Sequence, residues 1–557
     1  MKRETQRKTK RRTKRRTKRK TNQNKSGKMV HPFKYIMDIG TIPKILKRLF
    51  INSTFGWNKK GHWKIHKMDV KYATSISEIQ SLVKKCKLNN KTITTRGGGH
   101  CYNNTSIQGD YVLSLKNLYK NEIYIDDSKK SLKLIVDSTI RLGEIYNYVN
   151  NYNKKNNRKL LISGGTCATV GIGGFILGGG HGLLEPYYGS LCHLLTEAEG
   201  VDGLGRHITI NNKGIYDKDL DKYIKYGSNY ISSLRGAGHN MLNVTQFTID
   251  ITSLPEHTWD YKTYYLEWNG HDKKRKFTNN IINLYKLLND LSDTSTPYLI
   301  NGISSSNGSH PLIDGGSPSE FKKNKKDKYQ IELKLLIPCG DILQKIKKRN
   351  TKMISLEKIE KRLLMNDFKK TRAIYNKDWY DIWFNHIGEF WDLDSNKYST
   401  DIYWDSLVVE RNMKEKIKLD KLEFNDLPDR FDFFLHLNNK GLYYTLFPEK
   451  QPDTIQKKLY CWPPKNIKYV LQIFSYKDRL KLYPIKDYFP GDKCYINYPP
   501  STTNTKENAF IRYKNKDYYN PNKFYDTDRI NTIKDAQTTL DPNRIFNGKL
   551  SIFHSGR

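Results

Sequence analysis

The stretch that decides the fold is Gly164–Gly182, which reads GGTCATVGIGGFILGGGHG. Together with the residues just before it, it belongs to an uncharged run from Leu160 to Gly180 that contains eight glycines. So many glycines disfavour a membrane-spanning helix, because glycine lowers helical propensity and offers no packing surface to lipid. The stretch therefore predicts a buried, turn-rich backbone that itself lines a large ligand.

Two further glycine-rich segments accompany it. Arg96–His100 reads RGGGH after a short apolar run, and Arg235–Asn240 reads RGAGHN before the apolar run 243–251. Consecutive glycines let a phosphate approach backbone N–H groups, although a turn that ends a strand is the commoner explanation for one such loop. None of the spacings matches the phosphate-loop motif or the helix-opening dinucleotide fingerprint, so those two nucleotide-binding folds are not indicated.

In their order, these segments resemble the FAD-linked oxidases of the vanillyl-alcohol-oxidase type fold, most closely the berberine-bridge-enzyme-like branch. His100 stands where the family's R-x-G-G-H histidine bonds the flavin 8α-methyl, and Cys167 stands where the cysteine of G-x-C-x-T-V-G-x-G-G bonds flavin carbon 6. The resemblance thus implies a bicovalent FAD. Further matching motifs are Tyr187-Tyr188-Gly189, Val201-Asp202-Gly203, Arg235–Thr245, Tyr495-Ile496-Asn497-Tyr498 and Leu540–Phe546.

The resemblance also assigns the cofactor-binding residues. They are Arg96, Gly97, Gly98, Gly99, His100, Cys101, Tyr102, Cys167, Thr169, Val170, Gly171, Gly173, Gly174, Gly178, Gly182 and Asn497. Flavin dinucleotide carries an anionic pyrophosphate, which the glycine N–H groups at 97–99 and 171–174 suit. Two covalent bonds would fix the flavin ring and withdraw electron density from it, which favours hydride acceptance.

For alcohol oxidation, a base must remove the hydroxyl proton while the carbon loses hydride. The resemblance points to Tyr495 and Tyr498 for this role, with Gln472 as a helper on the preceding strand. Tyrosine has a reference pKa of about 10, so its neighbours must lower that pKa before it serves near neutrality. Val170 occupies the position that governs oxygen access in the family, and a valine there implies an oxidase rather than a dehydrogenase.

The pattern of elements predicts an α+β protein: a two-part FAD-binding domain plus an α+β substrate domain with a mostly antiparallel sheet. In the first domain we expect strands at 70–73, 92–95, 111–115, 131–136 and 160–162, and helices at 77–86 and 142–152. In the second we expect a helix at 277–291, a loop at 301–319, and strands at 329–337 and 470–475. The predicted domains are an arm at 1–28, a lead-in at 29–68 with a helix at 43–50, the FAD-binding domain at 69–254, the substrate domain at 255–490, and a segment at 491–557 that returns to the FAD-binding domain.

Charge is concentrated at the N-terminus. The 557 residues include 97 Lys and Arg against 57 Asp and Glu, a net +40, and residues 1–28 hold fifteen basic residues and one acid. This low-complexity arm has no secretory-signal pattern, so an intracellular or nuclear location, or a virion, is expected. We expect it to bind a polyanion, nucleic acid first and an anionic membrane second; a solvated tail or a nuclear-import signal are the alternatives.

Three functions fit the sequence. The first is an FAD-dependent alcohol or carbohydrate oxidase that passes electrons to molecular oxygen and gives hydrogen peroxide. The second is a polyanion-binding structural or genome-packaging protein built on an oxidase fold, since fold does not fix function. The third is oxidative ring closure on an alkaloid-like amine. The seven cysteines, odd in number and without C-x-x-C spacing, indicate neither a disulfide framework nor a zinc module, and no metal is expected.

Overall fold

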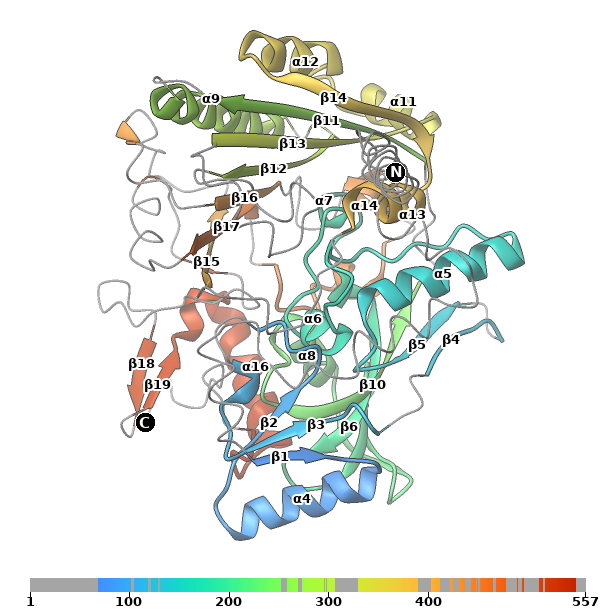
Figure 1. The fold of residues 1–557 in the computed structure, drawn as a ribbon. Coiled ribbons are helices and arrows are strands. Elements are labelled where there is room, and N and C mark those ends of the chain that lie inside the picture. The colour runs from blue at the N-terminus through green and yellow to red at the C-terminus, as the bar shows by residue number, and fades with distance from the viewer. Residues whose placement is uncertain are drawn as a thin grey trace, which may run out of the picture. The chain divides into compact units, whose positions relative to one another are not determined.

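The computed structural model describes residues 69–101, 105–118, 122–128, 131–251, 258–268, 273–294, 296, 298–305, 329–388, 402–410, 421–423, 430–435, 442–446, 448, 451–463, 467–476, 488, 493–494, 510–513 and 516–546. The predicted arm, the lead-in and the helix at 43–50 lie outside these residues, so polyanion binding by the arm stays a prediction. The domain boundaries likewise stay predictions. Figure 1 shows the arrangement of the elements.

The first part of the fold is a small parallel sheet. Its strands, in the order β1-β3-β2, are β1 (Asp69–Tyr72), β3 (Tyr111–Ser114) and β2 (Ile93–Arg96). Helix α4 (Ile76–Leu88) connects β1 to β2, and the Ser75 side chain caps it by accepting from the Glu78 N–H at 3.3 Å. The predicted strand, helix, strand order is confirmed.

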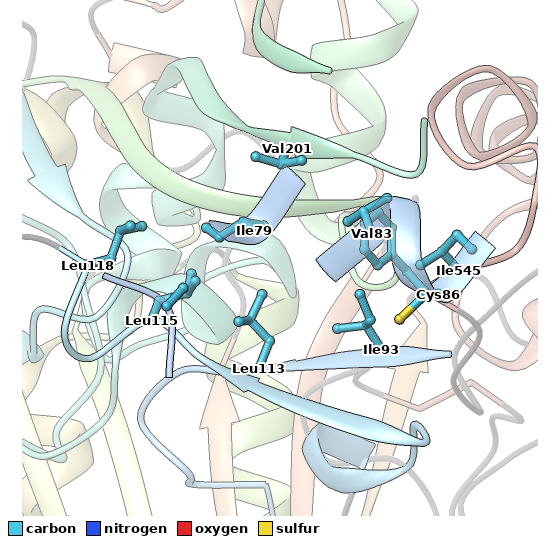
Figure 2. Close-up of a cluster of buried hydrophobic side chains, with 11 residues drawn as sticks. Ile79, Val83, Cys86, Ile93, Leu113, Leu115, Leu118, Val201 and Ile545 are labelled. Carbon is cyan, nitrogen blue, oxygen red and sulfur yellow. The ribbon is translucent and has the colours of Figure 1, made fainter. Parts of the chain in front are cut away.

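Apolar side chains of this part form one buried cluster (Figure 2). Ile79 and Val83 of α4 pack with Ile93 of β2 and Leu113 of β3. Burying one such side chain contributes about 1.5–3 kcal/mol relative to leaving it exposed. Ile545, from the far end of the chain, joins the same cluster, and its carbonyl accepts from the Ile93 N–H at 2.7 Å. The last described residues are therefore built into this core.

The Asp541 carboxylate makes that return possible. It accepts from the backbone N–H groups of Ile545 and Phe546, each at 2.8 Å, and closes a tight turn around them. Burial raises the pKa of this carboxyl to about 7. Gly203 lies against the same carboxylate, so closely that an added Cβ would lie 2.1 Å from Asp541 Oδ1.

A second sheet has seven strands, and all neighbouring strands are antiparallel. Its order is β4 (Ile123–Asp126), β5 (Lys133–Asp137), β10 (Leu242–Asp250), β6 (Leu195–Asp202), β7 (His207–Asn211), β8 (Gly214–Asp217) and β9 (Lys222–Tyr226). The helices that lie between β5 and β10 in the sequence are α5 (Leu142–Asn156), α6 (Ile172–Leu177), α7 (Glu185–Tyr188) and α8 (Asn229–Ala237). Helix α6 begins inside the predicted turn-rich stretch, where no helix was expected.

A third sheet of seven strands is also fully antiparallel, as predicted for the second domain. Its order is β14 (Lys369–Lys377), β11 (Trp259–Trp268), β13 (Tyr329–Pro338), β12 (Leu299–Ser305), β16 (Arg430–Leu435), β17 (Ile467–Tyr476) and β15 (Ile402–Glu410). In Figure 1, α9 (Lys273–Asp293) and α12 (Leu356–Met365) run along it. Glu360 of α12 accepts from Lys262 Nζ of β11 at 3.0 Å.

The remaining elements are short or follow the third sheet. They are a 3₁₀ turn at Thr105–Ile107, a 3₁₀ turn at Leu191–Leu194, α11 (Asp341–Arg349), α13 (Trp379–Ile382), a π-helical turn at Trp383–Ile387, α14 (Leu442–Leu446), α15 (Asp453–Gln456), the hairpin of β18 (Phe510–Tyr513) and β19 (Lys516–Tyr519), a 3₁₀ turn at Pro521–Lys523, and α16 (Thr527–Leu540). No described helix is long and apolar enough to cross a bilayer. The seven cysteines all lie among the described residues, and none of them forms a disulfide.

Two local predictions are wrong. Residues 160–162 form no strand, because side chains satisfy their backbone groups. Asn153 exchanges two hydrogen bonds with the Leu160 backbone, and the Ile162 N–H donates to the Tyr380 hydroxyl at 3.2 Å. The predicted loop at 301–319 begins instead as strand, since 301–305 belong to β12 and pair with both β13 and β16.

Candidate functional site

The two predicted attachment residues converge on one hydroxyl. His100 lies just after β2, and Cys167 lies in the loop before α6. His100 Nε2 is 2.8 Å from Thr169 Oγ1, and Cys167 Sγ is 3.3 Å from the same oxygen. The structure thus brings together residues from two loops that the sequence separates by 67 positions, as the resemblance predicts.

Glycine is required where these two loops cross. A Cβ added to Gly98 would lie 2.4 Å from the Gly171 nitrogen, and one added to Gly171 would lie 2.6 Å from the Gly98 nitrogen. Both distances are too short for a Cβ, so glycine at positions 98 and 171 allows the two backbones to be in direct contact. We expected the N–H groups of 171–174 to face a pyrophosphate. The Gly173 N–H instead donates to the Ser138 carbonyl at 3.0 Å, which assigns that glycine to packing.

Beside this crossing, two glycines leave their backbone uncovered. Gly97 and Gly174 are both exposed, and they come from the two different loops. A Cβ on Gly174 would meet no protein atom within 4 Å, and one on Gly97 would meet only the Gly174 nitrogen, at 4.0 Å. The backbone of both loops is therefore uncovered next to His100 and Cys167, as a bound flavin would need. The residues present fit the cofactor.

The N-terminus of helix α5 binds the loop that contains Cys167. The first N–H groups of the helix, at Leu142 and Gly143, donate to the carbonyls of Val170 at 3.0 Å and Ala168 at 2.9 Å. These N–H groups have no partner within a helix, so a loop that supplies carbonyls satisfies them. The contact fixes the backbone on both sides of Thr169.

Arg141, the residue that precedes α5, was missed by the sequence analysis. Its side chain is buried, and Nη1 donates to the Gly98 carbonyl at 2.9 Å and also to the Thr169 carbonyl. One guanidinium nitrogen therefore ties the two attachment loops together. The only signal in the sequence is a lone arginine directly before a helix, which is too common to single out.

The charges around His100 keep its imidazole neutral. Burial lowers the pKa of His100 well below its usual value, and the nearby Arg141 and Arg96 guanidinium groups lower it further. Burial also lowers the pKa of Arg141, to about 10, so this side chain remains cationic near neutrality. A neutral imidazole beside a fixed cation can use a ring nitrogen as a nucleophile.

The other predicted residues of the first loop support its shape. Gly99 adopts a φ of +74°, and its Cα faces the Arg96 guanidinium so closely that an added Cβ would lie 2.4 Å from Nη2. Cys101 accepts from the Thr105 N–H at 3.3 Å, which anchors the loop to the 3₁₀ turn that follows. Tyr102 lies outside the described residues.

Gly178 and Gly182 lie just after the C-terminal end of α6. The Gly178 N–H donates to the Gly174 carbonyl at 3.3 Å and ends the helix. A Cβ on Gly182 would lie 2.1 Å from the Gly164 carbonyl oxygen, so Gly182 permits two stretches of backbone to pack. The structure thus gives Gly182 a packing role and places Gly178 at the end of α6.

Trp383, which follows β14 of the third sheet, packs on the glycine-rich stretch at Gly165. Trp383 Nε1 and the Tyr146 hydroxyl both donate to the Gly165 carbonyl, each at 3.2 Å. The two rings meet edge to face with centroids 4.5 Å apart, and Tyr380 lies against the same tyrosine at 6.0 Å. Sequence reasoning missed this contact because Trp383 lies 218 positions from Gly165.

The third glycine segment is structural. The buried Arg235 guanidinium donates to the carbonyls of Leu195 at 2.7 and 2.9 Å and of Leu459 at 3.0 Å. Gly236 has a φ of +102° and faces Trp462. Trp462 Nε1 in turn donates to the buried Glu185 carboxylate at 3.1 Å. These contacts pin the segment 459–462 to the FAD-binding part.

Of the predicted catalytic residues, the structure describes Gln472. It lies in β17, 4% exposed, with Asp432 of β16 and Ser406 of β15 as its cross-strand neighbours. Its position in β17, the strand next to the edge strand β15, is therefore fixed by pairing on both sides. Tyr495, Asn497 and Tyr498 lie outside the described residues, and their roles stay predictions.

Comparison with known proteins agrees with this geometry. A family model described as "FAD binding domain" matches residues 70–211, which contain β1 to β7 and both attachment loops. This part of the chain is therefore similar to known FAD binding domains. The sequence is 31% identical over 156 residues to berberine bridge enzyme-like 4 from Arabidopsis thaliana, a match that spans 28% of this chain and 28% of that protein. The resemblance to the berberine-bridge-enzyme-like FAD-linked oxidases is confirmed.

Solved structures extend the likeness to the whole fold. Xylooligosaccharide oxidase from Myceliophthora thermophila C1, in complex with xylobiose, matches with a TM-score of 0.58 and 17% identity over 88% of this chain and 92% of that chain. Glucooligosaccharide oxidase from Acremonium strictum, which carries a 6-S-cysteinyl, 8α-N1-histidyl FAD, matches with a TM-score of 0.58 and 15% identity over 89% and 94%. At these identities the likeness establishes the fold, and the predicted fold class is confirmed.

Proposed function

We propose that the protein is an FAD-dependent oxidase in which His100 and Cys167 both bond the flavin. The observation that carries the proposal is the convergence of both side chains on the Thr169 hydroxyl, beside uncovered backbone at Gly97 and Gly174. When bound, FAD supplies the two-electron acceptor. The cysteinyl and histidyl bonds named for the Acremonium enzyme would have their counterparts at these two residues.

The hydrogen bond of His100 indicates which of its nitrogens carries the bond. Nε2 lies against Thr169 Oγ1, so Nδ1 is on the opposite side of the imidazole from that contact. We assign the flavin bond to Nδ1. Thr169 then fixes the ring orientation, while burial, together with the charges of Arg141 and Arg96, keeps the imidazole neutral. We assign Thr169, Arg96 and Arg141 to positioning the His100 imidazole, and none of them removes the substrate proton.

The substrate class we propose is an alcohol or carbohydrate, with proton removal by Tyr495 or Tyr498 and help from Gln472. The support is the architecture shared with two oligosaccharide oxidases, together with the buried position of Gln472 in the third sheet. The experiment is anaerobic mixing of the purified protein with a panel of oligosaccharides and simple alcohols. Bleaching of the flavin by one class, followed by peroxide release when oxygen is admitted, supports the proposal. No bleaching by either class contradicts it.

Val170→Leu is expected to slow reoxidation of the reduced flavin by oxygen without slowing its reduction by substrate. Val170 is partly exposed beside Thr169, and the Leu142 N–H holds its carbonyl, so the backbone stays in place and a leucine side chain extends further from the loop than valine does. Stopped-flow reoxidation in air measures the effect. Val170→Ala, which adds no bulk, is the control. An unmutated protein that reoxidises only with an artificial acceptor would make it a dehydrogenase.

A further inference from the structure

Arg141 joins the two attachment loops through a single nitrogen. Nη1 donates to the carbonyl of Gly98, in the His100 loop, and to that of Thr169, in the Cys167 loop. The residue is 8% exposed, and its own N–H donates to Glu144 Oε2 at 2.9 Å, which sets it at the start of α5. A buried arginine needs several partners to offset the loss of hydration, and here both carbonyls come from the loops of the candidate site.

Groups from three parts of the fold act electrostatically on Arg141. Burial lowers the pKa of Arg141, whereas Glu144 of α5 raises it, Arg96 of β2 lowers it, and negative charge on Cys167 raises it. Arg96 and Arg141 together also lower the pKa of Lys116, which follows β3. Because the interaction with Cys167 is mutual, the guanidinium stabilises the thiolate of that cysteine. The thiolate is the reactive form.

We propose that Arg141 is a positioning residue for flavin attachment, which holds His100 and Cys167 at one spacing and favours the Cys167 thiolate. This inference rests on the proposed bicovalent FAD. It concerns how the two bonds form, and it assigns Arg141 no contact with substrate.

The attachment chemistry balances with oxygen as oxidant. At Cys167 an S–H proton and one hydrogen of flavin carbon 6 are lost as the S–C bond forms. At His100 an N–H proton and one hydrogen of the 8α-methyl are lost as the N–C bond forms. Each step leaves two electrons on the flavin, and oxygen accepts them with two protons to give one hydrogen peroxide. Arg141 takes no part in the electron transfer.

Three variants distinguish the effect of the Arg141 charge from the effect of its side-chain shape. Arg141→Met keeps the length of the side chain and removes the charge, and Arg141→Lys keeps the charge but loses the planar fork that reaches two carbonyls. Arg158→Met is the matched control, because Arg158 is exposed just beyond the other end of α5. The purified proteins are incubated with added FAD from pH 6 to pH 9, then denatured and digested. The flavin on the peptide containing Cys167 and on that containing His100 is measured by mass, and folding is checked by thermal unfolding.

At neutral pH, Arg141→Met is expected to carry at least about tenfold less flavin on Cys167, with recovery as the pH rises and the thiolate forms unaided. Arg141→Lys should restore most of that bond, and Arg158→Met should match the unmutated protein. Full attachment in Arg141→Met overturns the inference, as does a loss that neither lysine nor high pH restores. Unmutated protein without covalent flavin contradicts the proposed function instead.

Discussion

Gly171→Ala is expected to yield a protein that retains almost no flavin and unfolds more easily. The new Cβ would lie 2.6 Å from the Gly98 nitrogen and 2.9 Å from its Cα, and backbone atoms cannot turn away as a side chain can. Arg141 also ties the Gly98 carbonyl in place. Overpacking of this kind costs about 1–3 kcal/mol, and here the strain separates the two attachment loops. Flavin absorbance per polypeptide and thermal unfolding measure both effects.

Gly174→Ala is the matched control. Beyond its neighbours and the backbone of its own helix, its Cβ would meet no atom within 4 Å, and alanine has the higher helical propensity, so the free energy of unfolding of the apoprotein should not fall. If the flavin lies on the uncovered backbone at Gly97 and Gly174, this variant loses flavin affinity without losing stability. A Gly171→Ala protein that binds flavin like the unmutated chain would contradict the crossing of the two loops.

Removal of the proposed catalytic base is expected to have the second large effect. Tyr498→Phe or Tyr495→Phe should slow flavin reduction by substrate about 10²-fold or more, because the phenol that accepts the hydroxyl proton is gone. The flavin should stay bound, since neither residue belongs to the attachment loops. Anaerobic stopped-flow reduction measures the rate.

The control for that experiment is Tyr226→Phe. Tyr226 is 76% exposed at the end of β9, so its hydroxyl has no part in the candidate site. It should reduce at the unmutated rate, whereas one of the other two variants should not. If both Tyr495→Phe and Tyr498→Phe also keep the original rate, the proton acceptor is another residue.

Local patterns in the sequence predicted most of the elements that surround the site. Helix α4 was predictable because Ile79, Leu82 and Val83 recur at helical spacing, and its observed bounds extend that prediction by one residue before and two after. His100 and Cys167 were predictable because each stands in a motif with fixed glycine spacing. Both kinds of signal lie within a few consecutive residues.

The rest of the site depends on contacts that the sequence does not encode locally. Gly165 meets Trp383 across 218 positions, and Arg141 meets Gly98 across 43. The motif marks Gly171 and Gly173 alike, but only three-dimensional packing shows that one crosses another backbone and that the other donates to Ser138. Glycine patterns therefore located the cofactor loops without telling which glycines face the cofactor.

The measurement that tests the central claim most directly is the mass of the intact, denatured protein. We predict that the unmutated polypeptide carries one FAD that survives acid precipitation, that His100→Ala and Cys167→Ala each still carry one, and that the double variant carries none. The singles control for loss of folding, since each keeps one of the two bonds. An unmutated polypeptide with no added mass, and all of its flavin in the supernatant, would contradict attachment at both residues.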